Sequence, residues 1–194
     1  MVWHSQDLFI GSKEIISALF GYGSFDEEAV LNSSKALYYF GLGLPAFAFI
    51  KVFSSFVFAR QNTKIPFYFS LISVIFNIII SLYFFNKIGF IIIPIATSMS
   101  SWLNSLLLLF YLIYKNYFNF KLEIIISFIR IVLVSLITSF IFYYLVDLTQ
   151  EYLAFESGYK LVTMLAVVVL TLIIYIMISI ITKAFKISDI KLKY

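Results

Sequence analysis

Long apolar runs alternate with short polar stretches along most of the chain. The runs cover residues 36–58, 67–85, 89–114, 124–146 and 161–181. Because a helix rises about 1.5 Å per residue, about 20 apolar residues cross the ~30 Å hydrocarbon core of a bilayer. The runs lack the strict alternation over about ten residues that marks barrel strands. The pattern predicts an all-α integral membrane protein, a polytopic bundle of five transmembrane helices.

The first 34 residues do not form a full span. Residues 8–20 are apolar but carry Ser12, Lys13 and Glu14, and they are too short to cross a bilayer. We interpret them as the end of a sixth helix whose beginning is missing, which makes Met1 an expected fragment boundary. Residues 21–34 predict a turn and a short amphipathic piece at the membrane surface. The expected domains are 1–34, a truncated helix end with a periplasmic loop, and 35–194, a five-helix membrane domain.

Composition supports a membrane protein and limits its chemistry. The chain is 62% hydrophobic and 12% charged, about half the ~25% charge of a soluble domain, and its mean hydropathy is +1.01. It has no cysteine, which excludes disulfides and thiolate chemistry. The one histidine, His4, has no partner at metal-ligand spacing, and no carboxylate lies within a predicted span. We therefore predict no enzyme, no metal site and no cofactor.

Basic residues are distributed unevenly between the two sides of the predicted membrane. If the loop at residues 59–66 is inside, the inside basic residues are Arg60, Lys64, Lys115, Lys121, Lys183, Lys186, Lys191 and Lys193. The outside basic residues are then Lys13, Lys35, Lys87 and Lys160. Basic residues concentrate on the cytoplasmic side of membrane proteins. The distribution predicts a multi-pass protein with a cytoplasmic C-terminus.

Polar side chains form stripes along two predicted spans. The second span carries Ser70, Ser73, Asn77 and Ser81 in one narrow stripe. The third carries Thr97, Ser98, Ser100, Ser101, Asn104 and Ser105 on about half of its helical wheel. Small and hydroxylated stripes face other helices or a wet cavity. One interpretation is helix packing; the other is a substrate path lined by Asn77, Thr97, Ser101 and Asn104.

The first span contains Gly41, Gly43 and Pro45. Proline has no backbone N–H and clashes with the preceding helical turn. We therefore expect this helix to bend near its outer half.

Two cations, Lys51 and Arg130, lie within predicted spans, each about two turns from the inside end. A charge near the bilayer centre is costly, so such a residue either extends its charged group to the interface or has a function. The functional hypothesis is attraction of a phosphate-bearing lipid, with Arg60 and Lys64 of the inside loop as further candidate contacts.

Several segments resemble the MurJ/MviN family of lipid II flippases. They are L-F-G-Y-G-S-F at 19–25, G-L-G-L-P at 41–45, I-K-V-F at 50–53, F-A-R-Q-N-T-K-I-P at 58–66 and G-F-I-I-I-P-I-A-T-S-M-S-S-W-L-N at 89–104. In the family the fourth segment has an aromatic residue, a small residue and R-Q-D-x-[RK]-T-P. Asn62 replaces the usual acidic residue here, and Ile65 replaces the usual threonine. The last two spans fit the family by hydropathy only.

The resemblance implies a known architecture. The family belongs to the multidrug/oligosaccharidyl-lipid/polysaccharide exporter superfamily, with fourteen helices in two lobes and cytoplasmic termini. This chain is similar to helices ten to fourteen, the C-terminal lobe, plus the end of the ninth. The last two family helices form a groove suited to a polyprenyl tail, which corresponds to residues 124–146 and 161–181. The implied location is the bacterial inner membrane.

The implied function is transport of lipid II, the undecaprenyl-linked peptidoglycan precursor, from the cytoplasmic to the periplasmic leaflet by alternating access. Expected partners are lipid II, membrane lipids and the missing N-terminal lobe of the same protein, with no nucleic acid. The family's headgroup-binding residues lie in helices absent here, so none is assigned to this chain. Two alternatives stay open: a polysaccharide-unit flippase or drug exporter of the same superfamily, and a non-transporting membrane scaffold.

Overall fold

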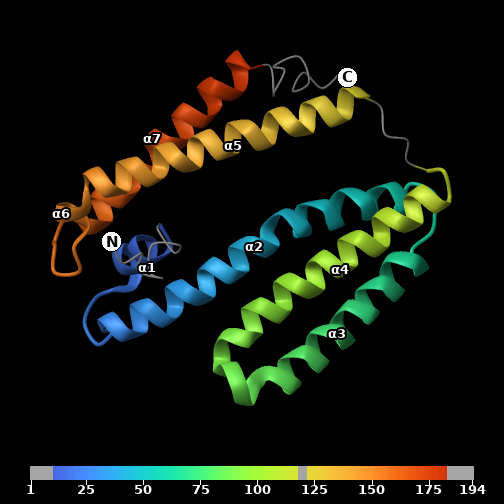
Figure 1. The fold of residues 1–194 in the computed structure, drawn as a ribbon, viewed down its shortest axis with the longest axis horizontal. Helices are drawn as coiled ribbons and strands as arrows, with labels where there is room; N and C mark the ends of the chain where they lie inside the picture. The colour runs from blue at the N-terminus through green and yellow to red at the C-terminus, as the bar shows by residue number, and fades with distance from the viewer. Residues whose placement is uncertain (1–10, 118–121, 183–194) are drawn as a thin grey trace, which may run out of the picture. The chain divides into compact units, whose positions relative to one another are not determined.

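The computed structural model of the chain describes residues 11–117 and 122–182. Within these ranges the chain forms helices and turns and no strand. The elements in order are α1 (Ser12–Phe20), α2 (Glu27–Phe58), α3 (Lys64–Ile88), the short 3-10 helix η2 (Gly89–Ile91), α4 (Ile92–Tyr114), α5 (Leu122–Leu148), α6 (Gln150–Leu153) and α7 (Lys160–Ile181) (Figure 1). His4, Lys121 and the basic tail beyond residue 182 lie outside the described residues.

Among the described residues, four helical stretches are long and apolar enough to cross a membrane. They are Glu27–Phe58, Lys64–Tyr114, Ile125–Leu148 and Lys160–Ile181. The second stretch is divided at η2 into α3, with 25 residues, and α4, with 23, and each of these exceeds the ~20 residues that a span needs. A polytopic all-α membrane protein is therefore confirmed, and the five predicted spans overlap α2, α3, α4, α5 and α7, with different ends.

Helix α2 begins at Glu27, well before the predicted start of the first span. The Asp26 carboxylate accepts a hydrogen bond from the Ala29 N–H at 2.8 Å, as a helix N-cap residue does. Glu27 and Glu28 occupy the first turn, where their charge complements the positive end of the helix dipole. Residues 27–34 thus belong to one continuous helix of 32 residues, which corrects the separate surface piece predicted for residues 21–34.

Helix α2 continues through Pro45 without interruption. On the N-terminal side of Pro45, α4 donates two side-chain hydrogen bonds to carbonyl groups of α2. The Ser98 hydroxyl donates to the Tyr39 carbonyl, and the Trp102 indole N–H donates to the Leu42 carbonyl at 3.0 Å. The carbonyl that Pro45 leaves without its helical donor is that of Gly41, four residues earlier, and neither of these two hydrogen bonds goes to it. The bend expected here stays a prediction.

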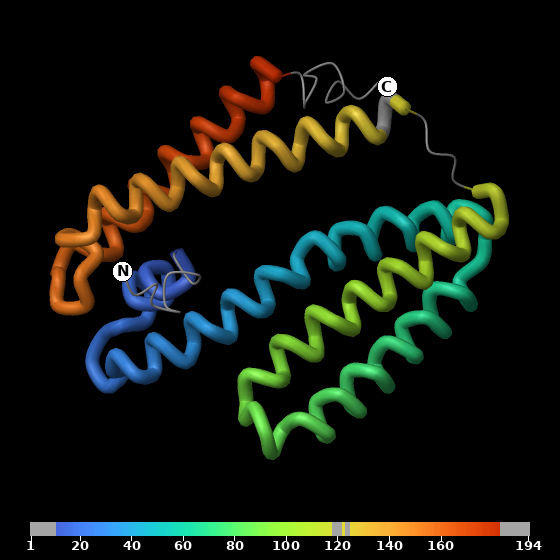
Figure 2. The backbone as a smooth tube through the Cα atoms, viewed as in Figure 1, coloured from blue at the N-terminus to red at the C-terminus, as the bar shows by residue number. Residues whose placement is uncertain are grey.

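Contacts divide the chain into two compact units, Met1–Ser34 with Phe120–Tyr194, and Lys35–Asn119. In the first unit, α5 and α7 pack side by side, and the connection from the end of α5 to the start of α7 contains α6 (Figure 2). In the second unit, α3 and α4 form a hairpin that turns at η2. The contacts group the C-terminal helices with the N-terminal segment. The division predicted from the sequence instead groups the C-terminal helices with the middle helices. That division stays a prediction.

The first unit contains a buried lysine, Lys160, which is only 2% exposed. Its ammonium donates to the carbonyls of Gly21 and Phe155, the latter at 2.7 Å. It also lies 4.3 Å from the ring centroid of Tyr22 and 4.6 Å from that of Phe155, within cation–π distance. The sequence suggested only an outside charge at this position. Instead, Lys160 fixes the loop after α1 to the start of α7.

The second unit has an apolar core between α2 and α4. Phe53 and Val57 of α2 pack with Leu108 and Leu112 of α4. Nearer the N-terminus of α4, Gly43 of α2 lies directly against Ser98, and a Cβ atom at this glycine would be 2.7 Å from the serine Oγ. The absent side chain therefore permits the close approach of the two helices.

We predict that Gly43→Ala destabilises the α2–α4 contact, because the new methyl group overlaps Ser98. Overpacking of this kind costs about 1–3 kcal/mol. Gly41→Ala is the matched control, since no heavy atom outside its own helix turn lies within 4 Å of a Cβ there. Thermal unfolding of the purified chain in detergent should show a lower midpoint for Gly43→Ala only. Equal midpoints for the two variants would contradict the close contact.

Candidate functional site

A pocket of about 370 Å³ lies between α2, α3 and α4. We call it the polar pocket, and its lining residues are Phe47, Ile50, Ser70, Ser73, Val74, Asn77, Thr97, Ser100, Ser101 and Asn104. The four residues proposed from the sequence as cavity-lining, Asn77, Thr97, Ser101 and Asn104, all lie here. The lining contains amides and hydroxyls but no charged side chain. The α3 stripe and the polar half of α4 thus face one another across the pocket.

Hydrogen bonds between side chains connect α3 and α4 at the polar pocket. The Asn77 amide donates to Thr97 Oγ1 at 3.3 Å and to Ser100 Oγ at 3.4 Å. The Asn104 amide donates to Ser70 Oγ at 3.3 Å. Asn104 is 8% exposed, and its Oδ1 atom has no hydrogen-bond partner among the described residues.

An unpaired buried acceptor determines what the polar pocket can bind. Leaving a buried carbonyl oxygen unpaired costs about 1–3 kcal/mol, and a ligand or water that donates a hydrogen bond to Asn104 Oδ1 removes this cost. A neutral group with hydroxyl or amide N–H donors fits a lining without charges. The sequence indicated the serines through their helical spacing, whereas nothing in it indicated that Phe47 and Ile50 of α2 line the pocket.

Two of the four candidate phosphate contacts lie at the connection between α2 and α3. The Arg60 guanidinium carbon is 4.1 Å from the ring centroid of Tyr117, and its Nη1 donates to the Phe56 carbonyl at 2.9 Å. Lys64 is exposed at the first residue of α3. The aromatic contact was not foreseen from the sequence, because Tyr117 lies beyond α4. It restricts the Arg60 side chain while leaving the residue exposed.

The other two candidate contacts are Lys51 and Arg130, both exposed. Neither has a polar side-chain partner within residues 11–117 and 122–182. Lys51 follows Ile50 of the polar pocket on α2, and Arg130 lies on α5 in the other unit. None of the four candidate cations lines the polar pocket.

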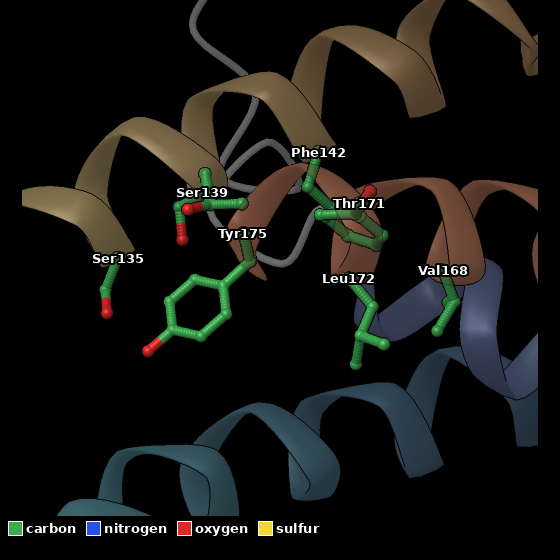
Figure 3. A pocket seen from close by; sticks show the side chains of 8 residues that line it. Ser135, Ser139, Phe142, Val168, Thr171, Leu172 and Tyr175 are labelled. Atoms are coloured by element: carbon green, nitrogen blue, oxygen red, sulfur yellow. The ribbon is translucent and has the colours of Figure 1, made fainter. Parts of the chain in front are cut away.

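A groove of about 340 Å³ lies between α5 and α7. This α5–α7 groove is lined by Ser135, Thr138, Ser139, Phe142, Val168, Thr171, Leu172 and Tyr175, contributed by both helices (Figure 3). The Thr138 hydroxyl donates to the Val134 carbonyl of its own helix, and the Thr171 hydroxyl donates to the Val167 carbonyl at 2.7 Å. The lining also contains the hydroxyls of Ser135, Ser139 and Tyr175, while Phe142, Val168 and Leu172 offer apolar contact to an alkyl chain.

These features define a multi-pass helical membrane protein with an uncharged polar pocket in one unit and a largely apolar groove in the other. The profile of the family "Lipid II flippase MurJ" matches residues 1–162. The chain belongs to this family, and the resemblance found in the sequence is confirmed.

Individual relatives agree with the family assignment. "Probable lipid II flippase MurJ" of Rhizobium meliloti (strain 1021) is 32% identical over 140 residues, covering 72% of this chain and 26% of that protein. "Lipid II flippase MurJ" of Thermosipho africanus (strain TCF52B) is 34% identical over 140 residues, covering 72% and 28%. The solved structure "Lipid II flippase MurJ, inward closed conformation" has a TM-score of 0.71 and 29% identity, covering 90% of this chain and 34% of that one. The chain thus spans about a quarter to a third of each of these proteins.

We predict that the polar pocket contains water when the chain is in a membrane. The chain has no cysteine, so Ser70→Cys introduces a single thiol that lines the pocket. Leu82→Cys is the control, because Leu82 lies on the same helix, is 73% exposed and is outside the pocket. A charged thiol reagent reacts with thiolate, which requires water. The pocket thiol should react about tenfold faster or more, and equal rates in vesicles would contradict a wet pocket.

Proposed function

We propose that this chain forms the C-terminal lobe of a transporter that moves lipid II from the cytoplasmic to the periplasmic leaflet of the bacterial inner membrane. The observation that carries the proposal is the match of residues 1–162 to the lipid II flippase family. The TM-score of 0.71 to a lipid II flippase supports it. Because the chain covers about a quarter of its relatives, a second lobe of the same protein completes the transport path in this proposal.

The task of such a transporter is physical rather than covalent. A polar headgroup must pass a hydrocarbon layer in which unpaired polar groups cost several kcal/mol. Alternating access solves this by rocking one lobe against the other around a binding site near the midplane. The polar pocket contributes uncharged donors and acceptors to that path, with Asn104 Oδ1 as an acceptor for a headgroup hydroxyl or N–H.

The polyprenyl tail of lipid II stays in the bilayer in this mechanism. The α5–α7 groove suits an isoprenoid chain, because Phe142, Val168 and Leu172 offer apolar contact and its threonine hydroxyls are paired within their own helices. Apolar contact in the groove guides the tail without requiring it to leave the hydrocarbon.

The candidate cations have a role at the phosphate end of the substrate. Arg60, Lys64, Lys51 and Arg130 attract a pyrophosphate-bearing lipid in this proposal, and Arg60 is suited to bidentate contact with phosphate oxygens. The uneven distribution of basic residues between the two sides of the predicted membrane supports a cytoplasmic location for Arg60 and Lys64, and a cytoplasmic C-terminus.

The decisive experiment compares the full-length gene with this chain alone in cells depleted of their own lipid II flippase. The expected result is rescue of growth and cell shape by the full-length form only, because the second lobe is needed. Rescue by this chain alone would contradict the two-lobe mechanism. Failure of a well-expressed full-length form would favour another substrate of the same superfamily.

A substitution in the α5–α7 groove tests the tail contact. Leu172→Trp in the full-length protein should fill the groove and slow transport about tenfold, equivalent to about 1.4 kcal/mol in the barrier. Ile173→Trp is the control, because Ile173 is 48% exposed on the same helix but does not line the groove. Rescue of flippase-depleted cells at matched protein levels gives the readout. Equal rescue by both variants would remove the groove from the proposal.

A further inference from the structure

A third pocket, of about 210 Å³, lies in the first unit where three membrane-capable helices begin or end. It is bordered by the start of α2, the residues after α5 and the segment before α7. We call it the helix-end pocket, and it is lined by Lys13, Glu14, Ser17, Glu27, Val30, Gln150, Leu153, Ala154 and Phe155. Unlike the polar pocket and the α5–α7 groove, it contains charges of both signs.

The charges of the helix-end pocket retain free hydrogen-bonding capacity. Lys13 Nζ lies 3.6 Å from Glu27 Oε1, which is longer than the usual ~2.7–3.2 Å of a hydrogen bond. The two side chains are 43% and 68% exposed. Glu14 uses one carboxylate oxygen, Oε2, to accept a hydrogen bond from the Gly11 N–H at 2.8 Å. An ammonium donor and carboxylate acceptors are thus available on adjacent walls.

Ser17 provides an independent sign of a binding site. The residue is 5% exposed, and its hydroxyl has no hydrogen-bond partner among the described residues. Elsewhere in the described chain, Thr138 and Thr171 pair their hydroxyls with carbonyls of their own helices, and Ser17 does not. An unpaired buried hydroxyl is unfavourable, and one that lines a pocket becomes paired when a polar ligand binds.

Lys160 contacts the far wall of the helix-end pocket through Phe155. The Lys160 ammonium donates to the Phe155 carbonyl at 2.7 Å and lies 4.6 Å from the centroid of its ring. A Cβ atom at Gly21 would be 3.0 Å from Phe155 Cε2, so the aromatic side chain is also packed against the loop after α1. Pockets that bind small ligands are usually formed in advance in this way.

We propose that the helix-end pocket binds the phosphoethanolamine headgroup of a membrane phospholipid. Its phosphate accepts hydrogen bonds from the Lys13 ammonium and the Ser17 hydroxyl, and its primary ammonium donates to Glu27 and Glu14. The ends of membrane-spanning helices lie at the level of the lipid headgroups, so the pocket opens where phospholipid headgroups are located. The inference does not rest on the transport proposal.

The chemistry of the pocket selects between headgroups. A wholly anionic headgroup is repelled by Glu14 and Glu27, and a quaternary ammonium has no N–H to donate to these carboxylates. Phosphatidylethanolamine therefore fits better than phosphatidylglycerol or phosphatidylcholine.

The test is thermal unfolding of the purified chain in detergent, titrated with short-chain forms of these three lipids. Phosphatidylethanolamine should raise the unfolding midpoint saturably, with an apparent affinity about tenfold higher than the other two. Glycerophosphoethanolamine, which has the headgroup but no acyl chains, separates a lipid from a free zwitterion. Equal affinity for this soluble compound would overturn the assignment of the ligand as a lipid. Equal shifts of the unfolding midpoint with all three lipids would overturn the assignment of the headgroup as phosphoethanolamine.

Matched variants assign the effect to the pocket. Glu27→Gln should weaken phosphatidylethanolamine binding about tenfold, whereas Glu28→Gln, one residue further on and outside the pocket, should not. Ser17→Ala should leave the lipid-free midpoint unchanged or raise it, because it removes an unpaired hydroxyl, and yet weaken binding. A Ser17→Ala variant that folds and binds like the unaltered chain, or equal loss in both glutamate variants, would overturn the proposal.

Discussion

The hydrogen bonds made by α4 are the constraint on which the Lys35–Asn119 unit depends. Toward α2, Ser98 and Trp102 donate to backbone carbonyls beside the helix-interior proline. Toward α3, Thr97 and Ser100 accept hydrogen bonds from Asn77. Inside a bilayer no water is available to pair the Ser98 hydroxyl, the Trp102 indole and the Asn77 amide, so these side chains use partners on neighbouring helices. The polar half of α4 therefore orients both neighbours, and apolar contacts between α2 and α4 lie in the same unit.

The same hydrogen bonds also reconcile the two interpretations of the polar stripes. Asn104 packs the helices through its amide N–H, which donates to Ser70, and leaves its Oδ1 unpaired in the pocket. Hydrogen bonds between membrane helices contribute only about 0.6 kcal/mol on average. They orient α3 and α4 without locking them together, which suits a pocket wall in the alternating-access mechanism that we propose.

The sequence predicts the spans well because hydropathy and helical spacing act over many residues at once. It predicts their ends less well, since a single cap determines where a helix begins. Asp26, Glu27 and Glu28 looked like a polar loop by composition, whereas the Asp26 cap makes the two glutamates the first turn of α2. The position of an N-cap was the available signal, and it outweighs the average polarity of the stretch.

The burial and contacts of Lys160 could not be predicted from the sequence, for a different reason. Its partners are two backbone carbonyls and two aromatic rings. None of these groups is charged, so a search of the sequence for an oppositely charged partner does not find them. The Gly21 carbonyl is also far away in the chain. Likewise, the polar pocket could be predicted from its α3 and α4 stripes, but not from Phe47 and Ile50, which are ordinary apolar residues of α2.

The polar pocket and the helix-end pocket differ in the charge of their lining. Amides and hydroxyls line the pocket between α2, α3 and α4, while the helix-end pocket contains ammonium and carboxylate groups. The physical reason is that a neutral group can be paired by one or two neighbours, whereas a charge also loses its hydration. Lys160 is buried near a helix end, where carbonyl oxygens and aromatic faces replace the lost water. The two proposed sites follow this physical rule: the headgroup with charges binds at the helix ends, and the neutral donors and acceptors lie between the helices.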